Sequence, residues 1–550
     1  MAVLAQEPTF VQLLGAGVGL LSLYLITGAI YRLYLSPLAP FPGPKLAALT
    51  LWYEFYFDVI LRGQFTFHIR DLHKRYGPIV RINPYELHVD DPDFYDELYG
   101  GSGRRVEKLP WSAAMFGNDT SMIATVSHEH HRARRAPLNA FFSKQSVYNL
   151  EPMIRNAVSL LCDRFEDFKT SKQPVVLDNA FSALTADIIT DYSFAKSSGM
   201  LLKPNFSPEY TRSLMTTSEF SLLNKQFPFI LHLLRKLPDW LAVKLEPNTA
   251  ALIEFQKGIE EQLLPIMEGR SAESKTSTKQ PTIFHELLRS NLPDSEKQLQ
   301  RLIDEGQTIV GAGSVTTAHY LSVTSYHIIA NPQVLQKLQE ELQPLMANRS
   351  TLPSLRQLEQ LPYLKAVINE GYRISYGITA RLTRVSPDSP LEYNDWLIPA
   401  GTPVGMTSIL VHENEKLFPE PKVFRPERWL QPGAQRLEKY LVTFNKGSRA
   451  CLGMNLARAE IPLTLAAVFG GRFGLELFET DRSDVDLKHD FFNPSPKLDS
   501  KGLRNQLFSI WHIDGSSGSR GAIACPLTTV SNDSSIPKDD KVPQTTNREM

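Results

Sequence analysis

Cysteine is scarce in this chain of 550 residues, which contains only Cys162, Cys451 and Cys525. Three scattered cysteines cannot build a disulfide framework, so a disulfide-rich secreted protein is excluded and a reducing compartment is favoured. A surplus of charge of one sign is also lacking, because 58 Lys and Arg residues balance 59 Asp and Glu residues. Without a basic surplus, nucleic acid is not an expected partner. The chain also lacks the GxGxxG and GxxxxGK[ST] patterns that cradle phosphates.

Charged residues are missing between Glu7 and Arg32, where the sequence is almost entirely apolar. About 20 apolar residues suffice to cross a bilayer as a helix. We therefore expect a membrane anchor at residues 10–34, preceded by a short lumenal segment at residues 1–9. The alternative is a cleaved signal peptide, which would have a basic start, a shorter apolar core and small residues at its cleavage site. Arg32 and Lys45 follow the span and favour a cytosolic body.

Proline, by contrast, is abundant, and its clusters mark two boundaries. Residues 35–44 contain four prolines, which predict a stiff, extended hinge because proline fixes φ and stops a helix. Residues 515–550 are rich in Ser, Thr, Asp, Pro and Lys, which predicts a disordered tail that includes Cys525. Residues 45–514 remain as one large domain.

Helical periodicity predominates in this domain. The longest predicted helix runs from Ser295 to Ala330, and others cover Gln333 to Met346 and Tyr363 to Tyr376. Short strands are expected from Trp396 to Val404, so the fold class is mainly α with small β-sheets. Gly311 to Thr317 interrupts the long helix with small residues, which indicates either a ligand groove or packing against a neighbouring helix.

Cys451 stands in an unusual setting, Phe444-Asn-Lys-Gly-Ser-Arg-Ala-Cys-Leu-Gly453, just before a predicted helix from Met454 to Phe469. Cations and helix N-termini stabilise a thiolate, which binds metals or acts as a nucleophile. A nucleophile needs a base, and no histidine is close in sequence. A cysteine without such neighbours is most often an inert buried residue.

The pattern FxxGxRxCxG resembles the haem-binding signature of the cytochrome P450 superfamily, and its fixed positions are Phe444, Gly447, Arg449, Cys451 and Gly453. Two further segments resemble motifs of that family: Glu370 to Arg373 is similar to ExxR, and Phe424 to Trp429 is similar to the PER segment. The resemblance implies the cytochrome P450 fold, haem b as cofactor and Cys451 as axial ligand of the haem iron. It also implies a buried structural triad of Glu370, Arg373 and Arg428, whereas an isolated Glu and Arg three residues apart would form an ordinary surface pair.

The small-residue segment is similar to the oxygen-groove motif AGx[DE]T[TS], which implies catalytic roles for the hydroxyl groups of Thr316 and Thr317. Val315 departs from the motif, since most members carry an acid there. In this comparison Gly311 and Gly313 let oxygen approach the helix backbone.

The haem propionates have further expected partners. His131 and Arg135 stand where many family members have a Trp and an Arg, and a histidine can also donate a hydrogen bond to a carboxylate. Arg449 completes the expected set of propionate partners, with Arg384 or Arg381 as a further choice.

The resemblance is closest to fungal, membrane-anchored members of the trichodiene-oxygenase-like group. It implies a monooxygenase of the endoplasmic reticulum membrane that uses O2 and an NADPH-cytochrome reductase, with cytochrome b5 as a possible second donor, to oxidise a hydrophobic small molecule of specialised metabolism. The segments expected to contact that substrate are Trp111 to Phe116, Phe220 to Phe229, Gly377 to Thr379 and Phe491-Phe492. Residues expected in reductase docking are Lys446, Arg132 and Arg134.

Two other functions are compatible with the same thiolate pocket. One is a redox-neutral isomerase or dehydratase, which the missing acid at Val315 supports and Thr316 opposes. The other is a non-catalytic haem-binding sensor or carrier.

Overall fold

The computed structural model describes residues 10–100, 103–113, 115–234, 236–245, 249–269, 282–346 and 352–509. These residues belong to one compact unit, Met1–Ile510. The expected lumenal segment and the expected tail with Cys525 lie outside the described residues.

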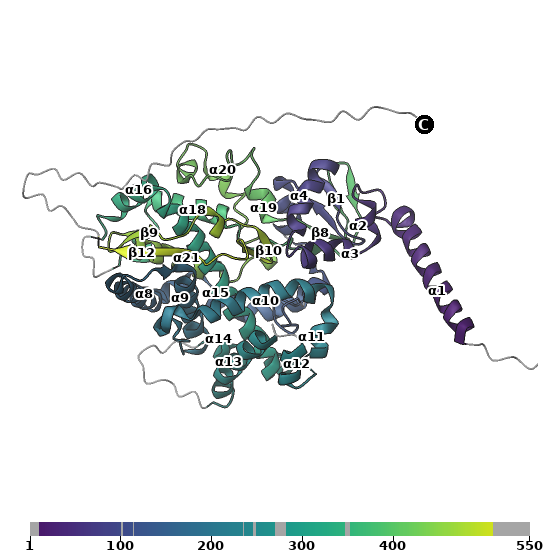
Figure 1. The fold of residues 1–550 in the computed structure, drawn as a ribbon, viewed down its shortest axis with the longest axis horizontal. Coiled ribbons are helices and arrows are strands. Elements are labelled where there is room, and N and C mark those ends of the chain that lie inside the picture. Colours follow the sequence, from purple (N-terminus) through teal and green to yellow (C-terminus); the bar gives the residue numbers. More distant parts are fainter. Residues whose placement is uncertain are drawn as a thin grey trace, which may run out of the picture. The chain divides into compact units, whose positions relative to one another are not determined.

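The expected fold class is confirmed, because helices make up most of the described chain (Figure 1). The longer helices are α1 Phe10–Ile30, α4 Phe65–Tyr76, α6 His128–Phe141, α8 Glu151–Ser171, α9 Leu177–Phe194, α10 Pro208–Gln226, α13 Thr249–Met267, α15 Leu299–Ile329, α16 Pro332–Leu342, α18 Pro362–Ser375 and α21 Met454–Phe469. The shorter helices are α2 Lys45–Leu49, α3 Trp52–Phe55, α5 Pro110–Ala113, α7 Lys144–Asn149, α11 Pro228–Leu234, α12 Asp239–Leu245, α14 Ile283–Arg289, α17 Leu355–Leu358, α19 Ser408–His412 and α20 Gln435–Glu438.

The strands are short and form small sheets. The largest sheet has the order β1-β2-β8-β5-β3, with β1 Ile79–Arg81, β2 Leu87–Val89, β8 Pro403–Gly405, β5 Arg384–Val385 and β3 Glu107–Lys108. A second has the order β4-β12-β9, with β4 Val175–Val176, β12 Arg504–Phe508 and β9 Gly474–Leu477. Two antiparallel pairs complete the set, β6 Leu391–Tyr393 with β7 Trp396–Ile398 and β10 His489–Phe491 with β11 Asn493–Ser495.

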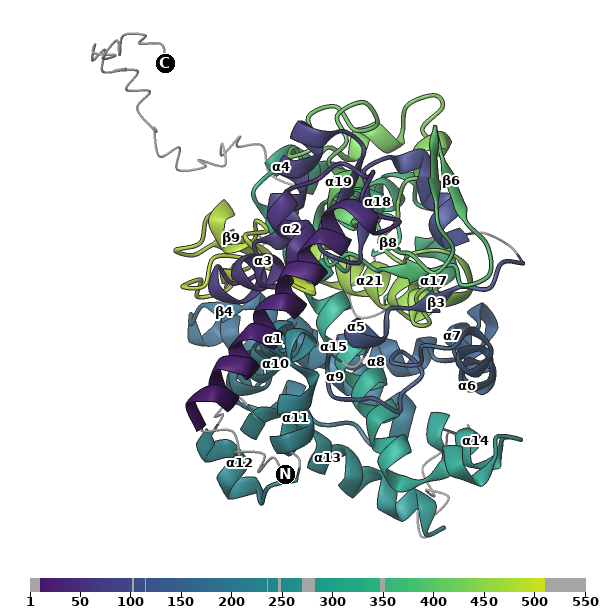
Figure 2. The same cartoon turned by 90° about the vertical axis from the view of Figure 1, so that its right-hand side faces the viewer.

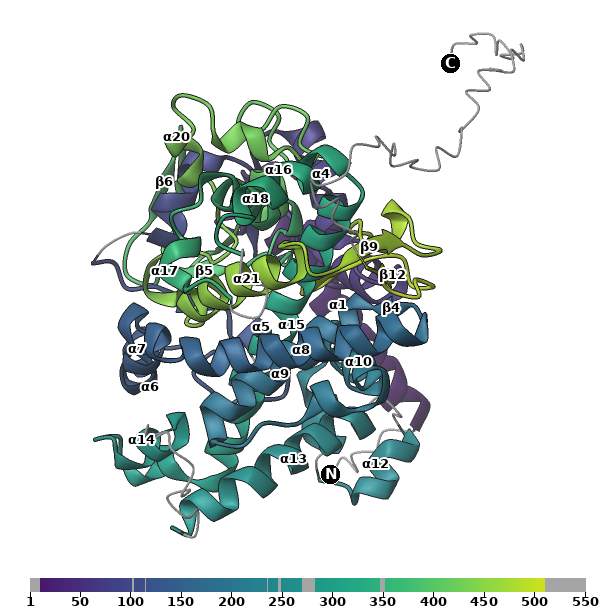
Figure 3. The same cartoon turned by 90° about the vertical axis from the view of Figure 1, so that its left-hand side faces the viewer.

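Helix α15 is the axis of the main hydrophobic core and packs against α9, α13, α18 and α21 (Figure 3). Most of its side chains are buried, as expected of a helix that runs through a domain. It begins four residues later than predicted, because Asp294–Lys297 form a short 3-10 helix and Gln298 is extended. Its close packing on α9 needs Gly313, where a Cβ atom would lie 2.8 Å from Ile189 Cγ1.

Helix α1 has the length and composition of a membrane span. The candidate span Phe10–Leu35 has 26 residues and a mean hydropathy of 2.0. No residue of α1 is buried against the body (Figures 1 and 2). Large apolar side chains that remain exposed along a whole helix favour a lipid environment.

The proline-rich segment after the span differs from the expected extended hinge. Residues 37–40 form a turn, and the side chains of Leu38 and Phe41 are buried in a hydrophobic cluster with the largest sheet. Phe41 stacks on Trp396 with ring centroids 4.8 Å apart. The prolines therefore fold the chain back onto the body instead of extending it, because two apolar side chains gain burial there.

Candidate active site

The segment around Cys451 forms a tight loop that ends at the N-terminus of α21. The Cys451 N–H donates to the Phe444 carbonyl oxygen at 2.8 Å, so the two ends of the loop are joined. Gly447 has a φ of +72°, and a Cβ atom there would lie 1.9 Å from the Tyr99 carbonyl oxygen. Only glycine fits this position. Gly453 is the residue before α21, so the sulfur lies at the start of that helix.

Cys451 faces an internal cavity of about 1240 Å³. Its side chain is exposed and lines this space. Burial raises the pKa of the Cys451 thiol, while the N–H groups of Gly453 and Met454 and the charge of Arg135 act to lower it. Two N–H groups after the loop and a cation from α6 therefore favour the thiolate, but burial has the larger effect on the thiol pKa.

Four predicted cofactor-binding side chains, Arg449, Arg135, His131 and Arg384, line this same cavity. Arg449 donates to the carbonyl oxygens of Thr125 and Val126 at 2.8 and 2.7 Å. Arg135 donates to the carbonyl oxygen of Ala450 at 2.7 Å, which ties α6 to the cysteine loop. Within the described residues, none of the four forms an ion pair with a carboxylate.

Arg384, on β5, donates to the carbonyl oxygens of Leu382 and Thr383, both at 3.1 Å. Arg381, named as an alternative, does not line the cavity. It is buried in an ion-pair cluster, with its guanidinium 2.7 Å from Glu54 and 3.1 Å from Glu86. Arg381 is therefore a structural residue, and that alternative was wrong.

Lys108 is a further basic side chain of the cavity that sequence reasoning missed. It lies on β3, and its ammonium group donates to the Ile123 carbonyl oxygen. Burial, together with the charges of Arg384 and Arg449, lowers its pKa well below the usual value. Nothing local in the sequence indicates this role, because the residue reaches the cavity only through the pairing of β3 with β5.

The same positive charges also lower the pKa values of other basic side chains in the cavity. Burial, Arg449, Arg135, Lys108 and Arg384 lower the pKa of His131 to about 2. Burial and Arg384 lower the pKa of Arg449 to about 9. Such a cluster is strained by its own positive charge and favours a bound anion.

This chemistry fits a haem. His131 Nδ1 and Arg449 Nε are buried and make no hydrogen bond within the protein. A ligand with two carboxylates would give these donors partners and would offset the positive charge. The thiol of Cys451 lines the same space and can bind iron as a thiolate.

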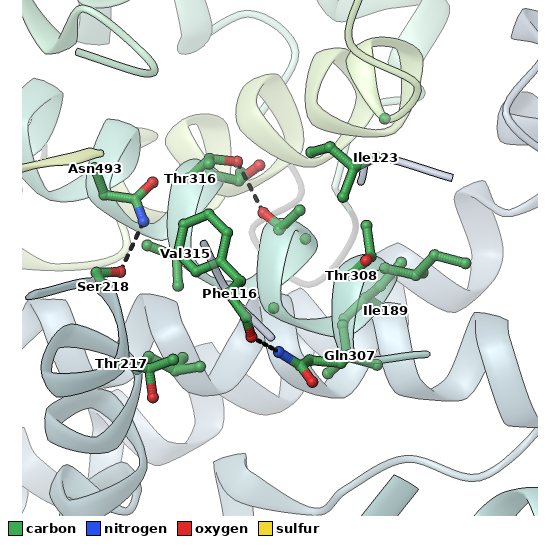
Figure 4. Close-up of a pocket in the computed structure, with 18 of the residues that line it drawn as sticks. Phe116, Ile123, Ile189, Thr217, Ser218, Gln307, Thr308, Val315, Thr316 and Asn493 are labelled. Atoms are coloured by element: carbon green, nitrogen blue, oxygen red, sulfur yellow. Dashed lines mark hydrogen bonds between the residues drawn. The ribbon is translucent and has the colours of Figure 1, made fainter. Parts of the chain in front are cut away.

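The wall that α15 contributes carries the expected hydroxyl groups (Figure 4). Thr316 is half-buried, and its hydroxyl donates to the Ala312 carbonyl oxygen at 3.0 Å. Val315 lines the cavity beside it with no acidic function. Thr317 is buried and lines the cavity together with Glu460 of α21, a residue that sequence reasoning did not single out.

The two glycines of this wall, which both line the cavity, differ in what surrounds them. Gly313 is required by Ile189 of α9, as shown above, so helix packing accounts for it. A Cβ atom at Gly311 would only reach ordinary contact with Phe255, at 3.9 Å. The alternative of packing against small residues therefore holds for Gly313.

The structure also brings Glu370, Arg373 and Arg428 together. Arg373 donates to both oxygens of Glu370 at 3.0 and 2.8 Å, and Arg428 Nε donates to Glu370 at 3.0 Å. Burial acts to raise the pKa of Glu370, but the hydrogen bond and charge of Arg373, with the charge of Arg428, hold it below the usual value. The pair of Glu370 and Arg373 is completely buried, so the surface-pair alternative is excluded.

Arg373 also donates to the carbonyl oxygen of His412 at 3.2 Å, and His412 Nε2 accepts from the N–H of Val442 at 3.0 Å. Thr443 donates to the carbonyl oxygen of Tyr372 at 2.8 Å. The triad is therefore connected to the start of the cysteine loop by two short paths.

The substrate-contact predictions are only partly matched. Phe116, Gly377, Ile378 and Phe492 line the cavity, but no residue of Phe220 to Phe229 does so. Helix α10 instead lines it with residues that precede this stretch, between Glu209 and Ser218. Figure 4 shows Thr217, Ser218 and Phe116 around the same space.

The three basic residues that were predicted to dock a reductase have different surroundings in the structure. Arg134 is buried and its guanidinium lies 2.8 Å from Glu296, so it is not available to a partner and that prediction was wrong. Lys446 is paired with Asp96 at 2.5 Å. Arg132 is exposed on α6.

Comparison with known proteins agrees with this geometry. Residues 42–501 match the family described as Cytochrome P450. A cytochrome P450 monooxygenase of Ascocoryne sarcoides is 46% identical over 90% of this chain and 98% of its own. A tryptophan 6-hydroxylase of Fusarium equiseti is 46% identical over 86% of this chain and 93% of its own. An N-acetyltryptophan 6-hydroxylase of Emericella nidulans is 44% identical over 88% of this chain and 95% of its own. Because the family model covers most of the chain and these relatives share 44–46% of its residues over nearly their whole length, the chain belongs to the cytochrome P450 family and is a monooxygenase of that family.

Proposed function

We propose that this protein is a membrane-bound haem b monooxygenase that hydroxylates a hydrophobic small molecule in specialised metabolism with electrons from an NADPH-cytochrome reductase. One observation carries the proposal: Cys451, the cation cluster and the Thr316 wall all line one cavity of about 1240 Å³. This volume can hold a cofactor and a substrate together, since pockets for drug-sized ligands occupy about 300–1,000 Å³.

The residues that line the cavity have different proposed roles. Bound haem supplies a redox-active iron that activates oxygen. Cys451 would bind the iron as a thiolate, while Arg449, Arg135, His131, Arg384 and Lys108 would hold the two propionates. Thr316 has acceptor capacity left after its bond to Ala312, so it can hold a water molecule at the opposite wall. That water carries protons to the reacting oxygen.

The remainder of the cavity is suited to an aromatic or other apolar substrate. Phe116 and Phe492 meet edge to face with ring centroids 4.9 Å apart, and both line the cavity. Gln307 donates to the Phe116 carbonyl oxygen and Asn493 to Ser218, at 2.8 and 2.9 Å (Figure 4). These bonds fix polar side chains at the edge of an otherwise apolar wall, which is the usual way in which a pocket orients a ligand.

The location follows from α1. The helix anchors the protein in the endoplasmic reticulum membrane as a single span, with the body in the cytosol, because Arg32 and Lys45 lie on the side of the body. Lys446 is already paired and Arg134 is buried, so Arg132 is the remaining candidate for contact with the reductase or cytochrome b5.

The experiment uses full-length protein in membranes with an NADPH-cytochrome reductase. The first probes are tryptophan and N-acetyltryptophan, because two relatives carry names that specify hydroxylation of these compounds. A wider comparison examines the metabolites of producing cells that contain the wild-type protein or its Cys451→Ala variant. We expect an NADPH-dependent product that gains one oxygen atom with the wild type only.

The labelled form of this assay is decisive. With ¹⁸O2 gas, the product must carry the label from molecular oxygen. A product formed without NADPH, or without label from oxygen, would contradict the proposal and favour the redox-neutral alternative.

A further inference from the structure

The hairpin of β10 and β11 brings one amide side chain to the cavity. Asn493 is the first residue of β11, it lines the cavity, and only 8% of its surface is exposed. Its Nδ2 group donates to Ser218 Oγ at 2.9 Å, which ties the hairpin to α10. Figure 4 shows its Oδ1 atom on the other arm of the amide, away from Ser218, and within the described residues no group donates to it. An acceptor in such a buried place needs a donor from a ligand or a water molecule.

The turn of this hairpin has an unusual backbone. Phe492 has a φ of +71°, a conformation that a bulky side chain rarely adopts. Its N–H donates to Asp490 Oδ1 at 3.0 Å, and its carbonyl oxygen accepts from the N–H of Thr379 at 3.0 Å. The hydroxyl group of Thr379 also donates to Asp490, at 2.7 Å. These bonds hold the turn in a strained conformation, and strain that surrounding contacts maintain is typical of positions that bind a ligand.

The same turn supplies an apolar surface beside the amide. The rings of Phe492 and Phe116 meet edge to face, as described above, and both line the cavity. Val315 of α15 adds a further apolar side chain to this part of the wall (Figure 4). Aromatic side chains bind flat rings through stacking and edge contacts. The surroundings of Asn493 therefore suit a flat, apolar molecule.

Other amide side chains of the cavity are already paired or enclosed. Gln307 Nε2 donates to the Phe116 carbonyl oxygen at 2.8 Å, and its Oε1 atom accepts from Gln256 at 2.6 Å. Asn118 Oδ1 also lacks a partner, but protein atoms enclose it. Asn493 differs from both, because its unpaired oxygen faces the cavity.

We propose that Asn493 is a specificity-determining residue whose carbonyl oxygen accepts a hydrogen bond from an N–H or O–H group of the substrate. The flat apolar part of the same molecule lies against Phe116 and Phe492. The enzyme thus selects aromatic molecules that carry a hydrogen-bond donor, because an analogue without the donor leaves the buried acceptor unpaired. The inference rests on the proposed function, since it names the substrate class of the same cavity.

The test is a binding titration of the haem-loaded full-length protein with 3-methylindole and 1-methylindole. These isomers have the same ring and one methyl group each, but in 1-methylindole the methyl group replaces the N–H donor. A ligand that displaces water near the haem iron changes the haem absorption spectrum, which gives a dissociation constant without turnover. We expect the wild type to bind 3-methylindole about tenfold more tightly, because a buried acceptor left unpaired weakens binding by about this factor.

The variants separate the amide oxygen from the shape of the cavity. Asn493→Leu has a similar size but no acceptor, so it should bind the two isomers with equal affinity. Asn493→Asp keeps an acceptor oxygen and should keep the preference for 3-methylindole. Ser218→Ala removes the bond that orients the amide and should reduce the preference without abolishing it. Asn291→Leu is the control, since Asn291 is exposed on the loop after α14.

Every variant is first checked for the haem-carbon monoxide spectrum. If Asn493→Leu does not bind haem, Asn493→Ala takes its place, because it also removes the oxygen. Equal affinities in the wild type, no spectral change with either isomer, or a full preference in the variant without the amide would overturn the proposal.

The titration uses neither NADPH nor reductase. Absence of a hydroxylated product would therefore contradict the proposed function and leave this inference intact. A hydroxylated product together with equal affinities for the two isomers would do the reverse.

Discussion

At the scale of single residues, the site combines basic groups that destabilise the folded protein when no cofactor is bound. Five cationic or imidazole side chains share one cavity, and two of their nitrogen atoms lack hydrogen-bond partners. Such groups destabilise a protein unless a ligand compensates them. Their presence in one place is best explained by the carboxylates of the cofactor.

Lys108 gives a direct test of this explanation. Lys108→Met should speed the dissociation of haem to an acceptor protein about tenfold, since a hydrogen bond to a charged group contributes about 1.5–3 kcal/mol. The same variant should leave the haem-free protein equally or more stable to heat, because it removes a buried, crowded cation. Lys365→Met is the control, since Lys365 is 62% exposed. A less stable haem-free protein with unchanged haem dissociation would assign Lys108 a purely structural role.

Thr316 is tested by its effect on oxygen chemistry. Thr316→Ala should bind haem normally but release more hydrogen peroxide per NADPH, because the hydroxyl group that holds water is lost. Thr316→Ser serves as the control and should stay close to the wild type. Unchanged peroxide release by a haem-loaded Thr316→Ala protein would reject a role in proton delivery.

The residues around Cys451 were predictable because their order along the chain carries the pattern. Lys108 was not, since it reaches the cavity through the pairing of two distant segments, β3 and β5. Arg381 and Arg384 show the same limit, because they stand three residues apart and only the structure separates a salt-bridge residue from a cavity residue.

At the scale of elements, α15 has to approach α9 closely while it also forms a wall of the cavity. The segment from Gly311 to Thr317 serves both purposes, because it packs against α9 and lines the cavity. The helix periodicity predicted the long helices well, and α21 has both predicted ends, Met454 and Phe469. The start of α15 was predicted four residues too early. Residues Asp294–Lys297 form a separate 3-10 helix, in which Glu296 pairs with Arg134 and Arg301.

The two glycines of α15 should respond oppositely to alanine. Gly313→Ala places Cβ against Ile189 and should lower the free energy of unfolding by about 1–3 kcal/mol, reduced by the better helix propensity of alanine. Gly311→Ala has room and should raise it by up to about 1 kcal/mol. Urea unfolding of both haem-loaded variants checks this. If Gly313→Ala is as stable as Gly311→Ala, close packing is not what requires Gly313.

At the scale of the whole molecule, the candidate membrane span Phe10–Leu35 is joined to the body by a segment whose side chains belong to the body's core. The sequence predicted the span and the boundary, but an extended hinge was expected. The burial of Leu38 and Phe41 depends on apolar partners such as Trp396, which are hundreds of residues away in the chain.

Two truncations separate the anchor from the packed segment. Deletion of residues 1–36 should release the protein from membranes into the soluble fraction with its haem retained. Deletion of residues 1–44 also removes Leu38 and Phe41 and should lower the free energy of unfolding by a further ~3–6 kcal/mol, since each buried apolar side chain contributes about 1.5–3 kcal/mol. Membrane fractionation and thermal unfolding measure the two effects. Equal stability of the two truncations would show that the segment is an independent linker.

The central claim is that Cys451 binds haem iron as a thiolate in a cavity shaped for oxygen activation. The most direct measurement is the absorption spectrum of the reduced protein under carbon monoxide. The wild type should show the long-wavelength maximum characteristic of thiolate ligation, and Cys451→Ala should lack it. A haem-loaded wild-type protein whose maximum stays at the shorter wavelength of a nitrogen-ligated haem would contradict the account.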